Sequence, residues 1–137
     1  MNLSPYLIFE GQCEEALKLY EKALGGKISF LQKYGGSPGE QMAVNKDWVM
    51  HATFQAKEFK IMASDRGEGA PVPSQEGMIW LSLDFDNEAE QDKVFKGLSE
   101  GGTVTMPLQD TFWGAKFGML TDKYGINWLF NHDYPKK

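Results

Sequence analysis

The stretches Gly25–Phe30 (GGKISF) and Gly101–Met106 (GGTVTM) decide the fold, because together they mark an internal repeat. Each one ends a helical pattern of apolar residues in two glycines and then enters an alternating, β-rich run. Glycine is the usual residue just beyond the last turn of a helix. A change of apolar period from 3.6 to 2 indicates that a strand follows. We therefore predict two copies of one structural module.

Reading outward from these stretches gives the same order of elements in both halves, namely strand, helix and three strands. The predicted strands cover residues 6–10, 27–34, 48–55, 59–64, 78–85, 103–107, 112–120 and 126–131. One predicted helix covers residues 13–24, and the other follows Asn87, which can cap it together with Glu90. The predicted fold class is α+β, with two βαβββ modules forming a curved mixed-sheet cup. It is one domain over residues 1–137, with modules at about 1–66 and 77–137 and a Gly/Pro-rich linker at about 67–76.

Composition and charge narrow the classes of function. The 137 residues carry a net charge of -5, which argues against nucleic acid as a partner. We find no apolar run long enough for a membrane span and no signal-peptide pattern at the first residues. The single cysteine, Cys13, agrees with a reducing compartment, so we expect a cytoplasmic protein. Cys13 lies at a helix start, where the dipole lowers a thiol's pKa, but its place on the apolar stripe favours buried packing.

Three motifs resemble one protein family. Phe9–Leu17 (FEGQCEEAL) resembles the first strand–helix unit of the PhnB-like branch of the vicinal oxygen chelate superfamily, and Met106–Gly114 (MPLQDTFWG) with Thr121–Trp128 (TDKYGINW) resembles its second signature. Wider relatives include glyoxalase I, fosfomycin-resistance enzymes, extradiol dioxygenases and bleomycin-binding proteins. The resemblance implies a bacterial protein that binds a small-molecule ligand and pairs as a homodimer. Some members have been labelled ubiquinone-pathway methyltransferases, but no glycine-rich loop follows the first strand here.

The resemblance also implies where a metal would be held. Metal-dependent relatives take one ligand from the first strand and one from the last strand of each module, usually His or Glu. By register these positions fall on Pro5, Met62, Met78 and Leu129. None is an effective ligand for a hard metal, and a thioether prefers soft metals. We therefore expect no metal and no other cofactor.

The remaining candidate ligand contacts are assigned to a face of the sheet by the alternation of side chains along each predicted strand. Trp80 follows Met78 by two residues and is expected on the same face, where Ser82 and Asp84 would also lie. Trp113 precedes a glycine that permits close approach, and either indole suits a pocket wall as well as a core. Trp128 should face the opposite side, towards a helix. Other predicted ligand contacts are Tyr6 or Phe112 as wall residues, Met62 and Leu129 as former ligand positions, and the amides of Asn127 and Asn131.

Two residues are candidates for acid–base chemistry. Asp84 would have a raised pKa inside an apolar cup, but it lies close to a strand end, where a solvated carboxylate is commoner. His51 lies within a strand, where a histidine bonded to its neighbours is the alternative. His132, beside Asp133, is expected at the surface.

Four functions are compatible with the sequence. The first, which the sequence favours, is a metal-free small-molecule binder. The others are a metal-free enzyme using Asp84 or His51, a lyase, isomerase or dioxygenase-like enzyme with metal in an unexpected register, and a structural or partner-binding protein. Whether the protein is an enzyme stays undecided.

Overall fold

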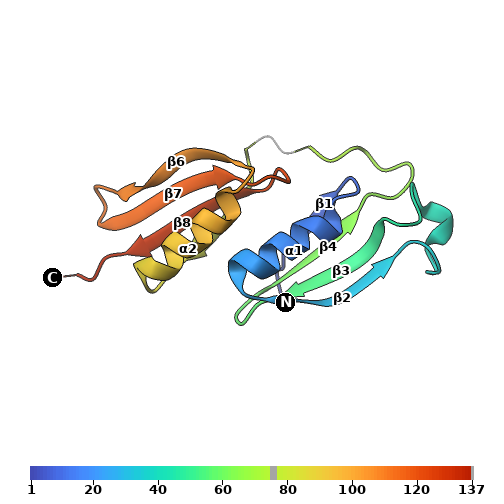
Figure 1. Ribbon diagram of the computed structural model, residues 1–137, viewed down its shortest axis with the longest axis horizontal. Coiled ribbons are helices and arrows are strands. Elements are labelled where there is room, and N and C mark those ends of the chain that lie inside the picture. Colours follow the sequence, from blue (N-terminus) through green and yellow to red (C-terminus); the bar gives the residue numbers. More distant parts are fainter. Residues whose placement is uncertain (75–76, 137) are drawn as a thin grey trace. The chain divides into compact units, whose positions relative to one another are not determined.

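The computed structural model describes residues 1–74 and 77–136, which form two compact units, Met1–Pro73 and Ser74–Lys137. The predicted linker at about 67–76 includes Gln75 and Glu76, which lie outside the described residues. Both units combine one α-helix with a four-stranded mixed sheet, so the predicted α+β class with two βαβββ modules is confirmed (Figure 1). The joining of the two modules into one cup stays a prediction.

The first unit contains the sheet β1-β4-β3-β2 and the helix α1 (Cys13–Leu24). Its strands are β1 (Tyr6–Phe9), β2 (Lys27–Lys33), β3 (Val49–Gln55) and β4 (Lys60–Asp65), and a short 3-10 helix η1 (Glu40–Met42) precedes β3. The pair β1 and β4 is parallel, whereas β4, β3 and β2 are antiparallel neighbours. A tight turn joins β3 and β4, in which Ala56 N donates to Phe59 O at 2.8 Å.

The second unit repeats this topology with the sheet β5-β8-β7-β6 and the helix α2 (Glu88–Ser99). Its strands are β5 (Leu81–Asp84), β6 (Thr103–Asp110), β7 (Ala115–Thr121) and β8 (Asn127–Asp133). Again the first strand runs parallel to the last, and the other pairs are antiparallel. Among the described residues, neither helix is long and apolar enough to cross a membrane.

Each helix covers one face of its own sheet. In the first unit Tyr20 of α1 meets Phe54 edge to face, with ring centroids 6.5 Å apart. In the second unit Phe95 of α2 meets Phe130 in the same way at 4.9 Å. Because side chains alternate across a strand, the residues on either side of Phe54 and Phe130 point to the opposite face. We call this opposite side the open face of each unit.

The local signals that end and begin the helices act as expected. Gly25 closes α1 in the left-handed conformation, with φ of 81°, and its N–H reaches Glu21 O. Asn87 caps α2 by accepting a hydrogen bond from Glu90 N at 2.7 Å. These two contacts satisfy backbone groups that a helix end leaves without an intrahelical partner.

Two strand starts were predicted wrongly. β5 begins at Leu81 rather than at Met78, because its parallel partner β8 first pairs at Trp128, opposite Leu81. β7 begins at Ala115 rather than at Phe112, because Thr111 bonds back to Ala115 and closes a turn around Gly114, whose φ is 84°. The strand-alternation argument for Met78 and Trp80 therefore does not apply.

Of three predictions about single side chains, one is wrong and two are confirmed. His132 is buried at 8% exposure rather than at the surface, because Phe85 O lies 2.9 Å from its Nδ1. The Cys13 thiol is buried as predicted, and burial, with Asp65 and Glu14 nearby, raises its pKa, so the alternative of a thiol activated by the helix dipole is not realised. Trp128 faces the helix side, is 1% exposed and donates to Asp122 Oδ2.

Candidate functional site

The open face of the first unit brings together three of the predicted site residues. Tyr6 of β1 pairs with Met62 of β4, and Met62 pairs with Thr53 of β3, so all three point the same way. His51 lies two residues before Thr53 and shares that face. The Tyr6 hydroxyl is 3.2 Å from His51 Nδ1, and the two ring centroids are 5.8 Å apart. Tyr6 thus reaches across β4 to a histidine on the next strand.

Phe30 completes this cluster, and it was not among the predicted site residues. It pairs with Thr53, its ring centroid is 6.0 Å from that of His51, and its side chain is 48% exposed. Strand alternation alone sets Phe30 on the same face as Ile28, which pairs with Phe54 on the helix side. Its face could be recognised only once the register against β3 was known, and a bulge shifts that register between Ile28 and Phe30.

Asp65 fixes the backbone beside this cluster. It is 1% exposed, and its carboxylate accepts hydrogen bonds from Gly11 N, Cys13 N and Val49 N at 2.8–3.0 Å. These bonds tie the turn between β1 and α1 to the starts of β3 and α1. The ends of β1 and β4 are further joined by an ion pair of Arg66 with Glu10 at 2.7 Å. Asp65 was not predicted as functional, and its role is structural.

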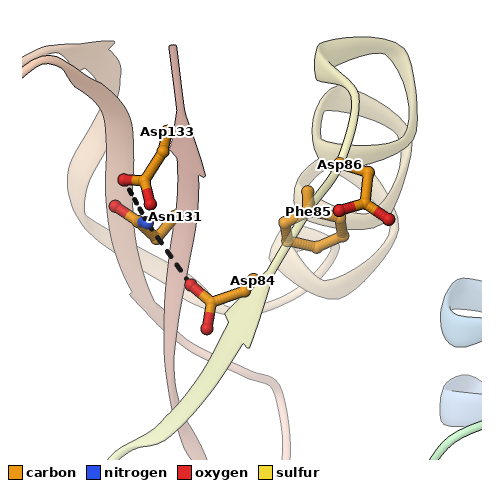
Figure 2. Close-up of a pocket in the computed structure, with 5 residues that line it drawn as sticks. All are labelled: Asp84, Phe85, Asp86, Asn131 and Asp133. Atoms are coloured by element: carbon orange, nitrogen blue, oxygen red, sulfur yellow. Dashed lines mark hydrogen bonds between the residues drawn. The ribbon is translucent and has the colours of Figure 1, made fainter. Parts of the chain in front are cut away.

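In the second unit, Asp84 lies at the end of β5 beside Asn131 of β8 (Figure 2). The Asn131 amide nitrogen donates to Asp84 Oδ1 at 3.3 Å and to Asp133 Oδ1 at 3.1 Å. A cavity of about 280 Å³ lies here and is lined by these three residues with Phe85 and Asp86. Asp84 is exposed and has acidic neighbours, so its surroundings are those of a solvated strand end rather than an apolar cup.

Trp113 lies beside the same open face. It is 52% exposed in the turn between β6 and β7, and its ring meets Phe117 at 5.5 Å and Phe112 at 5.0 Å, both edge to face. Phe117 pairs with Asn131, and Asn131 pairs with Asp84. A row of neighbouring side chains across the sheet therefore connects the Trp113 indole, through Phe117, with the Asp84 carboxylate. Phe112 itself is 97% exposed. Trp113 is therefore not a core residue of this unit.

The other predicted ligand contacts lie in β8 or just before β5. Leu129 is half-buried on the open face between Asn127 and Asn131. Asn127 is 5% exposed; it accepts from the Thr121 hydroxyl at 2.7 Å and donates to Ile79 O at 3.4 Å. Its amide is thus engaged within the unit. Met78 is 93% exposed ahead of β5, and Trp80 donates from Nε1 to Gly77 O at 2.7 Å.

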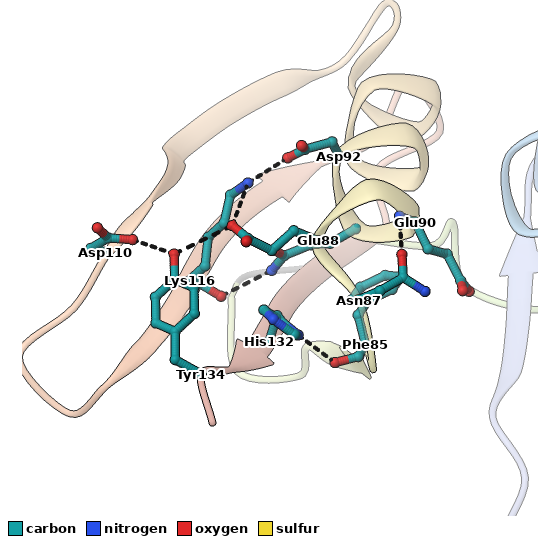
Figure 3. Close-up of polar contacts among 10 residues, drawn as sticks. Phe85, Asn87, Glu88, Glu90, Asp92, Asp110, Lys116, His132 and Tyr134 are labelled. Atoms are coloured by element: carbon teal, nitrogen blue, oxygen red, sulfur yellow. Dashed lines mark hydrogen bonds and ion pairs between the residues drawn. The ribbon is translucent and has the colours of Figure 1, made fainter. Parts of the chain in front are cut away.

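A polar network on the helix side holds the turn that carries Trp113 (Figure 3). The Tyr134 hydroxyl donates to Asp110 Oδ1, and Tyr134 N donates to Gly114 O at 3.0 Å. The turn is therefore fastened at both of its ends. The hydrogen bond to Asp110 raises the pKa of Tyr134 to about 12. Close by, Lys116 pairs with Asp92 at 2.7 Å, which raises the pKa of Lys116.

The side chains present do not fit the metal that the chelate resemblance implies. Within residues 1–74 and 77–136, no group of three or more His, Cys, Asp or Glu residues is placed to hold an ion. Among the four register positions, Pro5 and Met62 meet only through their backbones, with Met62 N donating to Pro5 O at 3.0 Å. His51, the one histidine on an open face, has a phenol as its polar neighbour. The donor set therefore gives no basis for a Lewis-acid step.

Comparison with known proteins places these features in a family context. Residues 2–130 match the model of the Glyoxalase/Bleomycin resistance protein/Dioxygenase superfamily. Protein YjdN of Escherichia coli (strain K12) is 32% identical over 141 residues, which cover 96% of this chain and 95% of YjdN.

Two solved structures share the whole fold. Protein PA1353 from Pseudomonas aeruginosa superimposes with a TM-score of 0.88 at 41% identity, covering 97% of this chain and 98% of that one. A Bacillus cereus structure, described as a putative 3-demethylubiquinone-9 3-methyltransferase and PhnB protein, gives a TM-score of 0.83 at 28% identity, covering 96% and 99%.

Proposed function

This chain belongs to the Glyoxalase/Bleomycin resistance protein/Dioxygenase superfamily, and from that premise we propose that it is a metal-free small-molecule-binding protein whose ligand lies on the open sheet faces. The resemblance to the PhnB-like branch agrees with the Bacillus cereus neighbour of that name. The superfamily's description names bleomycin resistance protein beside glyoxalase and dioxygenase, so its member types include both binding proteins and enzymes.

One observation carries this proposal: every predicted site residue that lies within a strand is on an open face. These residues are Tyr6, His51, Met62, Asp84, Asn127, Leu129 and Asn131. Aromatic side chains join them, and Tyr6, Phe30 and Trp113 are each about half exposed. Half-exposed rings with a few polar groups between them are the usual lining of a small-molecule site.

The proposal includes a homodimer. The helix side of each sheet is buried, whereas the open face of the first unit leaves apolar surface exposed outside the Tyr6–His51–Phe30 cluster, with Ile8 at 49%. Apolar sheet faces of this kind favour closed twofold association. Sedimentation at micromolar concentration should give twice the chain mass of 15.4 kDa, and a monomer would contradict this part of the proposal.

A thermal-shift screen of metabolites and aromatic antibiotics tests the binding function. We expect at least one compound to raise the melting temperature, and we expect Trp113→Ala and Trp80→Ala to reduce that shift. Val72→Ala is a matched control, because Val72 is 61% exposed and lies outside every strand and helix. A shift that survives both tryptophan substitutions would place the ligand elsewhere.

The second candidate function is a metal-free enzyme of the same superfamily, and the contact of Tyr6 with His51 favours it. A phenol bonded to an imidazole can orient the ring for proton transfer. Turnover of a screening hit that is abolished by His51→Gln or by Asp84→Asn, while binding persists, would establish this function instead. The methyltransferase description belongs to the Bacillus cereus protein, and no glycine-rich loop for a methyl donor follows β1 here.

A further inference from the structure

The first unit's open face holds an imidazole between two aromatic rings. His51 is half-buried, with the Tyr6 ring tilted by 31° on one side and the Phe30 ring tilted by 45° on the other. Met62 and Thr53 lie in the same row between the outer strands and form the floor. The arrangement sets the His51 imidazole between two aromatic rings, with the Met62 thioether, the Thr53 hydroxyl and the Gln32 amide on the same face.

The phenol of Tyr6 decides which nitrogen of His51 carries the proton. A phenol hydroxyl is a stronger donor than acceptor, and an unprotonated ring nitrogen is a good acceptor. The stronger of the two possible arrangements of this 3.2 Å contact has Tyr6 Oη donating to His51 Nδ1. A neutral imidazole whose Nδ1 accepts must carry its proton on Nε2. The free nitrogen of His51 is then a hydrogen-bond donor.

His132 has the opposite arrangement and provides an internal reference. Its Nδ1 lies 2.9 Å from Phe85 O, which can only accept, so Nδ1 carries the proton. The chain has two histidines, and the contacts assign them opposite tautomers. One NMR spectrum of the imidazole nitrogens can therefore report both tautomers.

We propose that this cluster binds a planar aromatic ligand through a hydrogen-bond acceptor, such as a carboxylate or carbonyl oxygen, which His51 Nε2 engages while Tyr6 and Phe30 contact the ring. The inference rests on the proposed binding function and names the ligand class for the first unit. The charged groups at the end of β1 and β4 do not compete, because Glu10 and Arg66 bind each other at 2.7 Å.

The first experiment reads the tautomers by long-range ¹H–¹⁵N correlation of the imidazole rings in the full-length protein. We expect the Nε2–H pattern for His51 and the Nδ1–H pattern for His132. Tyr6→Phe should move His51 towards a mixture of tautomers and leave His132 unchanged. An Nδ1–H pattern for His51 in the unmodified protein overturns the proposal.

The second experiment compares two probes with the same ring, 1-naphthoate and 1-naphthylmethylammonium. The first offers acceptor oxygens and the second only donors, while the net charge of -5 works against the anion. We expect naphthoate to bind about tenfold more tightly, as for a hydrogen bond to a charged group. We also expect His51→Phe to abolish the preference, and Phe30→Ala to weaken both probes alike.

The outcomes separate the two proposals. Equal affinity for both probes, or a preference that survives His51→Phe, overturns the inference and leaves the binding function intact. Tyr6→Phe supplies a second variant that keeps the ring, and it should reduce the preference without abolishing binding. If neither probe perturbs His51 at millimolar concentration, the inference fails, whereas the binding function fails only if the wider screen also gives no hit.

Discussion

Removing the carboxylate of Asp65 should destabilise the first unit severely, and the structure sets the size of the effect. The carboxylate is the acceptor for three backbone N–H groups, those of Gly11, Cys13 and Val49, at 2.8–3.0 Å. A buried N–H that loses its acceptor costs about 1–3 kcal/mol. Three such groups give a loss on the order of 3–6 kcal/mol in Asp65→Ala, if partial hydration is allowed for. Domains of this kind are stable by about 5–15 kcal/mol, so the loss removes a large share of the free energy of unfolding and should lower the urea midpoint strongly.

Asp65→Asn is the matched variant that keeps the shape of the side chain. One oxygen remains an acceptor, but an NH₂ group replaces the other and faces an N–H donor. We expect a loss of about 1–3 kcal/mol, between that of Asp65→Ala and the unmodified protein. Asp47→Asn serves as the control, because Asp47 is exposed in the turn before β3, and it should change the free energy of unfolding by less than about 0.5 kcal/mol.

Urea denaturation followed by circular dichroism measures all three variants, with the slope of the transition compared to check that the unfolded state is the same. Loss of the Asp65 bonds should also loosen the turn from Gly11 to Cys13. The Cys13 thiol should then react with a thiol reagent below the urea midpoint. An Asp65→Ala protein that unfolds within about 1 kcal/mol of the unmodified chain would refute the reasoning, since the three N–H groups would then need no buried acceptor.

Three further results are expected. Cys13 should resist a thiol reagent at pH 8 until the protein unfolds, because burial raises its pKa; rapid reaction of the native protein would contradict this. Asn87→Ala should cost about 1 kcal/mol in urea unfolding and Asn87→Asp almost nothing, because Asp preserves the acceptor for Glu90 N. In an ultraviolet pH titration, Tyr134→Phe should remove a tyrosine that ionises near pH 12. Since that pKa is raised on folding, the stability from this bond is present below about pH 10 and is lost as the pH rises towards 12; an unchanged titration would contradict it.

The order of elements could be predicted because the signals are local. Paired glycines after a helix and an Asn cap each act within a few residues, and the structure contains both. The turn at Asp122 to Gly125, between β7 and β8, is equally local. In the turn, Asp122 Oδ1 accepts from Tyr124 N and Ile126 N, which is a side-chain interaction that favours this backbone shape. Such signals do not depend on which strand is the neighbour.

The predictions that failed are those that depend on pairing with a distant strand. The β5 ladder begins at Leu81, opposite Trp128 near the start of β8, and nothing near Met78 in the sequence records where β8 begins. His132 looked exposed beside Asp133, yet its ring nitrogen reaches Phe85, which is 47 residues away. Phe30 likewise joined the site only through its register against β3. Periodicity gives the face of a strand but not the length of its ladder.

The two modules show that the repeat conserves the skeleton and not the chemistry. Both place the first strand parallel to the last and a helix on one face. At the strand ends, however, the first unit joins Glu10 to Arg66, whereas the second sets Asp84 against an amide and two more carboxylates. In α2, the side-chain amide nitrogen of Gln91 donates to Lys116 O, whereas its buried amide oxygen has no hydrogen-bond partner in the described structure. The buried face of α2 thus carries a polar group that the packing of this helix against its sheet does not require. Function in this fold therefore has to be argued from the side chains of each open face separately, because the shared topology would support many ligands and specifies none.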